Sequence, residues 1–551
     1  MTSSGAGRLR VALLQLPAFD LVDHELAWEE LLRRIDEAGE RAPDLVVTPE
    51  ASYPAYFLHS RQRYDATDLL ADDEVLATLS ERAARYRCHL AIGLVLSAGR
   101  RGQSDALENV VVVFGPDGTE LARYAKRFLW HFDRQWFTPG DDPPLVELQL
   151  SESSDRGLPA GLMICADGRL PELAREAGAA QARLLIEPTA WVSSGRDASA
   201  LSNPQADYLL PARAIEQGAW VIAADKVGVE AGSIVYAGRS GIIDPTGAWV
   251  IQAPSDRPGM VLHTIDLAAA PGPAVEWRPA IGDAYLEPGP SRVTELAREP
   301  LIIEDAAARV AVVALAVSPS AVELMELARE LVLVAAGQDA ALTLLPDLAG
   351  DEQHAPTQEE LLPLLQSLAA EGNLLLAVTL AERTNEATYK TLYLLDRGEV
   401  IAAHRQTHLT VPEQQAGYSA GDRPSPVIET MVGHVGLIAA SEGLVPELAG
   451  ALKRQGAELL LWSSAESTPA PLTLFARTRA LEQSCYVLGA SGSGGGGAVI
   501  AAPGGGLLAE ALEGETMVVS ADINRAFARW NDVAPGTSAI RDHERGAWAR
   551  P

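Results

Sequence analysis

The sequence predicts an α/β fold in which two similar domains follow one another, and three observations lead to this prediction. Short runs of β-branched and aliphatic residues alternate with amphipathic stretches of helix length. The order of these segments in the first half of the 551-residue chain recurs in the second half. The composition, 47 % hydrophobic and 21 % charged, is that of a globular protein rather than a disordered or fibrous one. Alternation of this kind layers helices over sheets and places chemistry at strand ends.

The first elements illustrate the pattern. RLRVALLQL (8–16) predicts a strand because apolar residues dominate it. HELAWEELLRRIDEAGERA (24–42) predicts a helix because apolar residues return every three or four positions between charged ones. DLVVTPEA (44–51) predicts a strand that ends at Pro49-Glu50. The same criteria predict helices at 73–87, 171–179 and 204–219, and strands at 88–96, 109–118, 161–168 and 182–191.

Seven segments of the first half are echoed in the same order in the second half. GLMICADGRLPELA (161–174), for example, is echoed by GLIAASEGLVPELA (436–449). We infer tandem copies of one domain, 1–295 and 296–551, joined by a stretch rich in proline and glycine at 271–292.

The two copies differ at three positions where chemistry is expected. In the first copy these positions hold a carboxylate, an ammonium and a thiol, each at or just beyond the end of a predicted strand. Only the first copy therefore carries a nucleophile. The matched pairs are Glu50 with Asp347, Lys126 with Gln406, and Cys165 with Ala440.

A carboxylate, an ammonium and a thiol are the groups that covalent acyl transfer needs. A nearby ammonium favours the thiolate, and a carboxylate can take the thiol proton and later activate water. Taken one at a time, the same residues have plainer interpretations. An isolated cysteine in an apolar strand is usually an inert packing residue, and a lone glutamate or lysine usually belongs to a surface ion pair.

Seven short motifs of residues 8–290 decide between these interpretations, because in order they resemble the carbon–nitrogen hydrolase (nitrilase/amidase) superfamily. They are PEASY (49–53), YAK (124–126), FTPGD (137–141), ICADGRLPE (164–172), PTAW (188–191), RAIE (213–216) and SGIIDPTG (240–247). The resemblance implies a four-layer α-β-β-α sandwich, present twice in this chain, with the second copy lacking the catalytic triad.

The resemblance also implies a role for each triad residue. Cys165 would attack the carbon of an amide, and Glu50 would act as general base and then as acid toward the leaving nitrogen. Lys126 would stabilise the oxyanion together with the backbone N–H of Ala166. Water activated by Glu50 would release the acid from the thioester, and neither a metal nor an organic cofactor would take part.

Three further residues are candidates for the substrate site. Many members of the superfamily carry a second glutamate in the loop after the lysine, and here HFDRQWFTPG (131–140) offers Asp133 as the nearest acid. Asp133 would either orient substrate or pair with Arg134 or a neighbouring arginine. Tyr56 and Trp191 lie near the motifs and would line the pocket, with plain packing as their alternative.

The phrase that follows the nucleophile, ADGRLPE (166–172), resembles amidase-like members more than the C-W-E of nitrile-cleaving ones. It therefore predicts hydrolysis of a non-peptide C–N bond in a small amide, with release of ammonia or an amine. The alternatives are a nitrilase, an N-carbamoyl amine hydrolase, an N-acyltransferase and a non-catalytic amide-binding protein.

The resemblance implies a small-molecule amide as the partner, and the charge of the chain disfavours nucleic acid and membrane surfaces. The net charge of −30 repels nucleic acid and anionic lipid. No apolar run approaches the roughly 18 residues of a membrane span. The three separated cysteines make no disulfide framework, so we expect a cytoplasmic protein.

The second copy has two possible roles. Domains of the superfamily commonly pair their helices across a dimer, so the fused copy would form an intrachain pseudo-dimer, with further homo-oligomers possible. Alternatively its altered pocket binds a ligand or regulator, through residues such as Asp347, Gln406 and Glu442.

Overall fold

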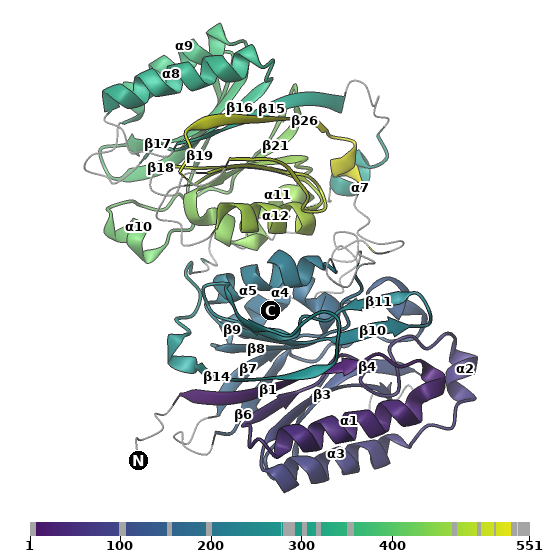
Figure 1. The fold of residues 1–551 in the computed structure, drawn as a ribbon. Coiled ribbons are helices and arrows are strands. Elements are labelled where there is room, and N and C mark those ends of the chain that lie inside the picture. The colour runs from purple at the N-terminus through teal and green to yellow at the C-terminus, as the bar shows by residue number, and fades with distance from the viewer. Residues whose placement is uncertain are drawn as a thin grey trace. The chain divides into compact units, whose positions relative to one another are not determined.

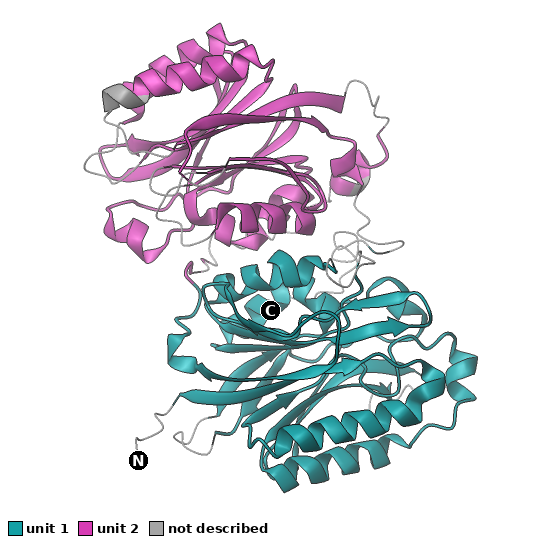
Figure 2. Ribbon diagram, in the orientation of Figure 1, with its two compact units in different colours: residues 1–273, 534–537, 546–551 teal, residues 274–533, 538–545 magenta. Residues whose placement is uncertain are grey.

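The computed structural model divides the chain into two compact units (Figure 2). Unit 1 comprises residues 1–273, 534–537 and 546–551, and unit 2 comprises residues 274–533 and 538–545. Most of the predicted linker, 279–291, lies outside the residues that the structure describes. The described residues are 7–98, 106–150, 157–193, 201–276, 278, 292–299, 306–315, 321–349, 357–464, 471–492, 497–511, 514–530 and 537.

The first sheet of unit 1 carries α1 (His24–Gly39) and α3 (Asp72–Tyr86) on its outer face (Figure 1). Its strands, in spatial order, are β11 (Ile234–Ala237), β10 (Lys226–Glu230), β1 (Arg8–Pro17), β2 (Leu45–Val47), β3 (His89–Ser97), β4 (Leu107–Phe114) and β5 (Glu120–Ala125), and β14 (Gly259–Asp266) also pairs with β1. Successive side chains of β1 point to opposite faces. Leu13 joins the core between the sheets, whereas Leu14 packs toward the helices, which explains the continuous apolar run.

The second sheet of unit 1 is covered by α4 (Pro171–Ala179) and α5 (Leu210–Gln217) (Figure 1). Its strands, in spatial order, are β13 (Trp249–Gln252), β12 (Gly241–Ile243), β9 (Trp220–Ala224), β8 (Leu184–Pro188), β7 (Leu158–Leu162) and β6 (Leu145–Leu148). Val47 of the first sheet and Ile186 and Val221 of the second are fully buried in one core between the sheets. Unit 1 is thus the four-layer α-β-β-α sandwich that the sequence predicted.

Unit 2 repeats this architecture. Its first sheet orders β19 (Glu399–Arg405), β18 (Thr388–Asp396), β17 (Leu375–Arg383), β16 (Leu342–Asp347), β15 (Ala307–Ala314) and β26 (Met517–Asn524) beneath α8 (Ala321–Gly337) and α9 (Gln358–Glu371). Its second sheet orders β20 (Val427–Thr430), β21 (Gly433–Ala439), β22 (Leu459–Ser464), β23 (Tyr486–Ser491), β24 (Ala498–Ala501) and β25 (Leu507–Ala511) beneath α11 (Pro446–Arg454) and α12 (Leu472–Gln483).

The two units have the same strand order, with one difference. Strands β5-β4-β3-β2-β1-β14 of unit 1 correspond to β19-β18-β17-β16-β15-β26 of unit 2, and the second sheets correspond strand for strand. The hairpin β10–β11 of unit 1 has no counterpart among the described residues between β23 and β24. The tandem repetition predicted from the sequence is confirmed, and the β10–β11 hairpin distinguishes unit 1 from the described part of unit 2.

Several predicted strands end earlier than the apolar pattern indicated. The strand predicted at 161–168 ends at Leu162, and Cys165 begins a 3₁₀ turn (Cys165–Arg169) instead. The strand predicted at 44–51 ends at Val47. Cys165 has a φ of 46°, in the left-handed region, which a strand cannot contain. The chain leaves the sheet at these ends, and the polar residues lie in the turns that follow.

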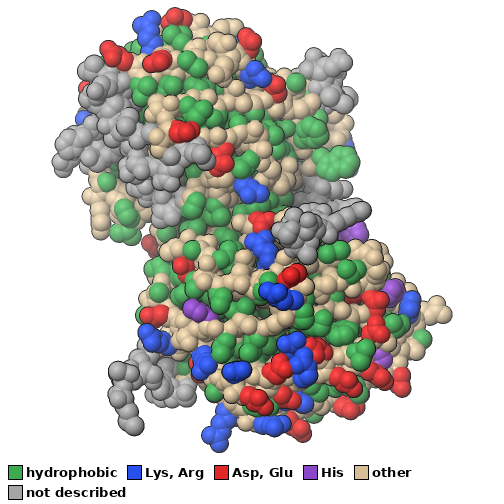
Figure 3. All heavy atoms as spheres, viewed as in Figure 1, with side chains coloured by type: hydrophobic (Ala, Val, Ile, Leu, Met, Phe, Trp, Pro, Cys, Tyr) green, Lys and Arg blue, Asp and Glu red, His purple; other side chains and the backbone are tan. Residues whose placement is uncertain are grey.

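Charged side chains gather over the part of unit 1 that α1 and α3 cover (Figure 3). On α1, Arg33 and Arg34 both pair with Glu30 and Glu37 one turn away. In the described part of the chain, no helix combines the length and the apolar character that crossing a membrane requires.

Candidate active site

The structure brings Glu50, Lys126 and Asp133 together in unit 1. Glu50 follows β2, and Lys126 follows β5 directly. Nζ of Lys126 lies 2.7 Å from Oε1 of Glu50 and 2.7 Å from Oδ2 of Asp133, and all three side chains are fully buried. One ammonium therefore bridges two carboxylates in a site that excludes water.

The backbone around Cys165 is held by Asp167, two residues later. Oδ2 of Asp167 accepts from the N–H of Ile164 at 3.0 Å and from the hydroxyl of Tyr124 at 2.9 Å. Oδ1 accepts from the N–H of Phe128 at 2.8 Å. Asp167 thereby ties the turn of the thiol to β5, the strand that leads to the lysine.

The carbonyl of Cys165 accepts a 2.9 Å hydrogen bond from Nε2 of Gln205. Ala166, predicted as an oxyanion donor, follows Cys165 in the same 3₁₀ turn and is buried.

Glu50 is oriented by a residue that the sequence analysis missed. Nδ2 of Asn109 donates to Oε1 of Glu50 at 2.7 Å, alongside Lys126. Oε2 of Glu50 has no hydrogen-bond partner among the described residues. Strand β3 lies close to the backbone that carries Glu50. A Cβ at Gly93 of this strand would be 2.2 Å from the carbonyl oxygen of Pro49, so only glycine fits there. The available signal for Asn109 was a polar side chain near the start of an otherwise apolar strand.

Asp133 lies in the 3₁₀ turn His131–Gln135 and also contacts Tyr56. Its Oδ1 accepts from the hydroxyl of Tyr56 at 2.7 Å, and its Oδ2 accepts from the N–H of Trp130 at 3.0 Å. Nε of Arg134, the partner considered from the sequence, donates to the carbonyl of Leu129.

The turn that carries Asp133 is also tied to the far end of the chain. The N–H of His131 donates to Oγ1 of Thr537 at 2.9 Å, and Thr537 is grouped with unit 1 and fully buried. The two residues are separated by 406 positions in the sequence, so local sequence patterns could not predict this contact.

The surroundings of Cys165 favour the neutral thiol over the thiolate. Burial and the Glu50 carboxylate raise the pKa of Cys165 well above its ordinary value. Lys126 lowers the pKa of Cys165, as expected from the sequence, but the opposite effects of burial and Glu50 are larger. Burial alone would lower the pKa of Lys126, but the carboxylates of Asp133 and Glu50 hold that pKa well above its usual range. The site therefore pairs a neutral thiol with a charged ammonium and needs a base to generate the nucleophile.

Trp191 packs in the core between the two sheets, in the same cluster as Cys165. Its backbone N–H donates to Oδ1 of Asp225 at 2.8 Å, and its buried Nε1 has no partner among the described residues.

Arg169, four residues after Cys165, is partly exposed at this site. Its guanidinium lies 4.2 Å from the ring centroid of Trp130, in a cation–π contact. In the described part of the chain, no carboxylate or carbonyl accepts a hydrogen bond from it. Burial lowers the pKa of Arg169, against a smaller opposing effect of Tyr208, Cys165 and Glu187.

Within the described ranges, no group of three His, Cys, Asp or Glu side chains is placed to hold a metal ion.

The matched positions of unit 2 hold a different set of groups. Ala440 begins the 3₁₀ turn that corresponds to the turn of Cys165. Gln406 stands where unit 1 has Lys126, and its Nε2 donates to Oγ of Ser441 at 2.8 Å. A buried ammonium is still present, because Nζ of Lys390 lies 2.9 Å from Oδ2 of Asp347.

Lys390 occupies the place of Asn109 rather than that of Lys126. The N–H of Lys126 bonds to the carbonyl of Asn109, and the N–H of Gln406 bonds in the same way to that of Lys390. Unit 2 thus keeps a buried lysine–carboxylate pair, but its lysine comes from the neighbouring strand. The position that matches Cys165 is Ala440, which carries no thiol.

The sequence is similar to known carbon-nitrogen hydrolases in both of its halves. The family described as carbon-nitrogen hydrolase matches residues 10–271 and again residues 309–530. A probable nitrilase of Schizosaccharomyces pombe is 26 % identical over 263 residues, which cover 47 % of this chain and 89 % of that protein. The deaminated glutathione amidase of Escherichia coli O157:H7 is 28 % identical over 245 residues, covering 42 % of this chain and 80 % of that protein. Among solved structures, an amidase from Nesterenkonia sp. AN1 matches at 24 % identity with a TM-score of 0.40, covering 49 % of this chain and 94 % of that one.

Proposed function

Because the chain belongs to the carbon–nitrogen hydrolase family, whose domain it carries twice, we propose that unit 1 hydrolyses a small amide through a thioester on Cys165. Family membership makes the chain an enzyme acting on non-peptide C–N bonds in amides or nitriles. The observation that carries the finer proposal is the buried bridge of Lys126 between Glu50 and Asp133 beside the turn of Cys165.

In the first step Glu50 takes the thiol proton while Sγ of Cys165 attacks the carbonyl carbon. Oε2 of Glu50 has no competing hydrogen bond among the described residues and is the oxygen available for this proton. The thiol lies close enough to lower the pKa of Glu50, which burial raises. Lys126 and the N–H of Ala166 stabilise the oxyanion as the tetrahedral intermediate forms.

In the second step the protonated Glu50 gives its proton to the leaving nitrogen, and the C–N bond breaks. Ammonia or an amine departs, leaving the acyl group on Cys165 as a thioester. Glu50, again a carboxylate, takes a proton from water, whose oxygen attacks the thioester. Collapse of this second intermediate returns the proton to sulfur and releases the acid.

Asp133, Asn109 and Tyr56 orient these groups. Asp133 binds the same Lys126 ammonium as Glu50 and so orients that ammonium. The hydroxyl of Tyr56 donates to Asp133 and holds its carboxylate in place. Asn109 donates to the same oxygen of Glu50 as Lys126 and leaves the other oxygen for the thiol.

Amides are favoured over nitriles by the phrase after the nucleophile, while the relatives include proteins named as amidases and proteins named as nitrilases. Arg169 extends the proposal to amides that carry an acidic group. Its guanidinium is stacked on Trp130 and has no hydrogen-bonded anion among the described residues. A substrate carboxylate would therefore supply the hydrogen-bond acceptors for this guanidinium. Unit 2 has alanine in place of the nucleophile, and we propose that it does not turn over substrate.

The test is ammonia release from aliphatic amides, ω-amidic acids, N-carbamoyl amines and nitriles, comparing the native chain with Cys165→Ala. The matched control is Cys485→Ala, because Cys485 is a buried free cysteine of unit 2. We expect release to vanish only in Cys165→Ala, and ω-amidic acids to be the best substrates. Release that survives in Cys165→Ala would exclude the thioester, and preferred release from nitriles would make the enzyme a nitrilase. Added amines that divert the acid into a new amide would identify an acyltransferase.

A further inference from the structure

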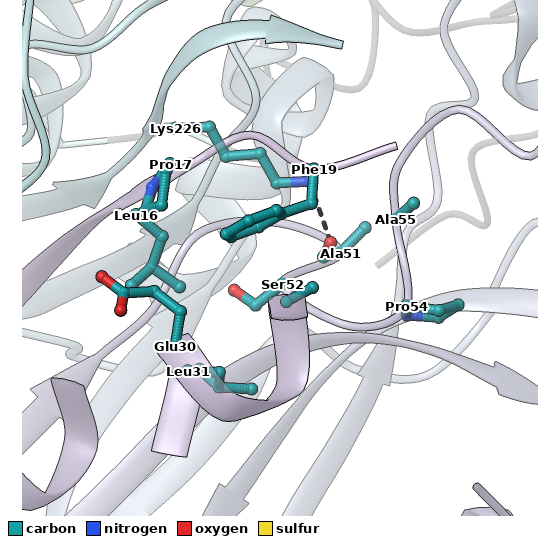
Figure 4. Close-up of a pocket in the computed structure, with 11 residues that line it drawn as sticks. Leu16, Pro17, Phe19, Glu30, Leu31, Ala51, Ser52, Pro54, Ala55 and Lys226 are labelled. Atoms are coloured by element: carbon teal, nitrogen blue, oxygen red, sulfur yellow. Dashed lines mark hydrogen bonds between the residues drawn. The ribbon is translucent and has the colours of Figure 1, made fainter. Parts of the chain in front are cut away.

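Behind the candidate active site, two side chains of β10 hold the loop formed by residues 51–57. Nζ of Lys226 donates to the carbonyl oxygen of Ala51 at 2.9 Å, the dashed line in Figure 4. The N–H of Phe57 donates to Oε1 of Glu230 at 2.6 Å. The loop is therefore fixed by the same strand at both of its ends.

Lys226 and Glu230 form one buried pair rather than two separate anchors. They lie four residues apart on a strand, so their side chains share a face. Nζ of Lys226 is 3.7 Å from Oε2 of Glu230, and that oxygen also accepts the hydroxyl of Tyr236 at 2.7 Å. The two side chains are 4 % and 0 % exposed, so each provides the charge that keeps the other from being buried alone.

The loop needs such support because Ala51 has a φ of 45°, in the left-handed region. A non-glycine residue holds this conformation only where its surroundings enforce it. Ala51 follows Glu50 directly, so relaxation of this strain would displace the carboxylate.

At the other end of the loop, Phe57 follows Tyr56, whose hydroxyl donates to Asp133. The Lys226–Glu230 pair, called the clamp below, therefore acts next to Glu50 at one end of the loop. At the other end it acts next to Tyr56, which binds Asp133.

The pair acts from outside the reaction site. Lys226 lines a small pocket together with Phe19 and Glu30 (Figure 4). Neither Glu50 nor Cys165 is among the residues that line it. The hydrogen bond that Lys226 makes toward the site is the one to the loop, at Ala51.

Unit 2 offers a comparison within the same chain. Its described residues contain no counterpart of the β10–β11 hairpin. The loop after Asp347 is held instead by the hydroxyl of Tyr418, which donates to the carbonyl of Ala349 at 2.7 Å. The ionic clamp thus accompanies the copy that has the nucleophile.

We propose that Lys226 and Glu230 are positioning residues that hold the Glu50 carboxylate within reach of the Cys165 thiol by clamping the loop between them. The proposal rests on the proposed function of unit 1 and assigns a catalytic purpose to the hairpin that distinguishes it from unit 2.

The test compares four variants of the full chain. Lys226→Met breaks the clamp, and Lys226→Met with Glu230→Gln breaks it without leaving a buried charge alone, which protects folding. Lys226→Arg keeps the charge and a donor. Lys453→Met is the matched control, because Lys453 is a buried lysine of unit 2 that donates to the carbonyls of Ser484 and Ala528.

Each variant is measured for kcat, KM, thermal unfolding, and the pH dependence of Cys165 alkylation by iodoacetamide. In the two clamp-breaking variants we expect kcat to fall between about tenfold and a hundredfold, with KM changing less than about threefold. The alkylation midpoint should move to lower pH, because a displaced Glu50 no longer raises the pKa of the thiol. Lys226→Arg should recover part of kcat, and Lys453→Met should leave kcat and the midpoint unchanged.

A folded double variant with native kcat would overturn the proposal. So would a rise in KM at constant kcat, which would indicate contact with substrate, or an equal loss of kcat in Lys453→Met, which would indicate general destabilisation. Alkylation needs no substrate, so it separates the two proposals. If the native chain hydrolyses no amide, the proposed function fails, while a shifted midpoint still supports the clamp and an unshifted one overturns it.

Discussion

Cys165 and Ala440 begin matched 3₁₀ turns with the same φ of 46°. This left-handed conformation disfavours a side chain, yet unit 2 retains it without a nucleophile. The reason lies in the turn itself, because Glu442 of unit 2 accepts the N–H of Ala439 as Asp167 of unit 1 accepts that of Ile164. The strained turn is therefore a property of the fold, and the chemistry was added to it or lost from it separately.

Restoring a cysteine to unit 2 should not restore activity. In a Cys165→Ala background, Ala440→Cys would place a thiol beside Gln406, a neutral amide, with the only matched ammonium, Lys390, on the neighbouring strand. We expect no ammonia release above the Cys165→Ala background. Release approaching the native rate would show that unit 2 lacks only its nucleophile.

Replacing Glu50 by glutamine should separate hydrolysis from thiol reactivity. Amide turnover should fall by about 10²–10⁴-fold, because the general base is lost. The carboxylate raises the pKa of Cys165, so its removal lowers that pKa and increases the thiolate fraction at about pH 8. Alkylation at that pH should consequently be faster in Glu50→Gln than in the native chain. Slower alkylation would mean that Glu50 activates the thiol at rest.

Replacing Lys126 by methionine should destabilise unit 1 in a pH-dependent way. Two buried carboxylates, Glu50 and Asp133, would lose their shared counter-charge, at a cost of about 3–5 kcal/mol in the free energy of unfolding near neutral pH. Burial already raises the pKa of Glu50, and loss of the Lys126 ammonium, which lowers it, would raise the pKa of Glu50 in the folded variant further above its unfolded value near 4.

The folded Lys126→Met variant would then bind more protons than the unfolded chain, so its stability falls as the pH rises through that range and recovers below it. Thermal unfolding followed between about pH 4 and pH 7 measures this effect. Lys453→Met provides the control, because Lys453 donates to backbone carbonyls and its loss strands no carboxylate. Parallel pH profiles for the two variants would contradict the bridge.

Replacing Arg169 by glutamine should change substrate preference. If a substrate carboxylate binds the guanidinium, KM for ω-amidic acids should rise about tenfold or more, which corresponds to about 1.4 kcal/mol or more for a charged hydrogen bond. KM for neutral aliphatic amides should change little. The measurement is the KM of one ω-amidic acid and one neutral amide in steady-state kinetics. Arg63→Gln, at an exposed arginine of α2 (Arg61–Asp65), is the control for loss of a positive charge. Equal changes for both classes would assign Arg169 to packing on Trp130.

Much of the fold could be predicted because strands buried on both faces read as continuous apolar runs. The strand at 8–16 and the helix at 171–179 were predicted within one residue of their observed bounds. The predicted ends of 44–51 and 161–168 were wrong, because the strands end at Val47 and Leu162 and both Glu50 and Cys165 lie in the turns that follow. The hairpin β10–β11 was not predicted.

The sequence by itself determined that a four-layer α/β domain occurs twice and that a thiol, a carboxylate and an ammonium belong to the first copy. These conclusions depend on residue type and order along the chain. The tertiary structure alone decided that Asp133 shares the ammonium of Lys126, that Asn109 donates a hydrogen bond to Glu50, and that burial and Glu50 raise the pKa of the Cys165 thiol. The physical reason is that hydrogen-bond partners and desolvation depend on which strand ends meet in space, and such neighbours leave no pattern in the local sequence.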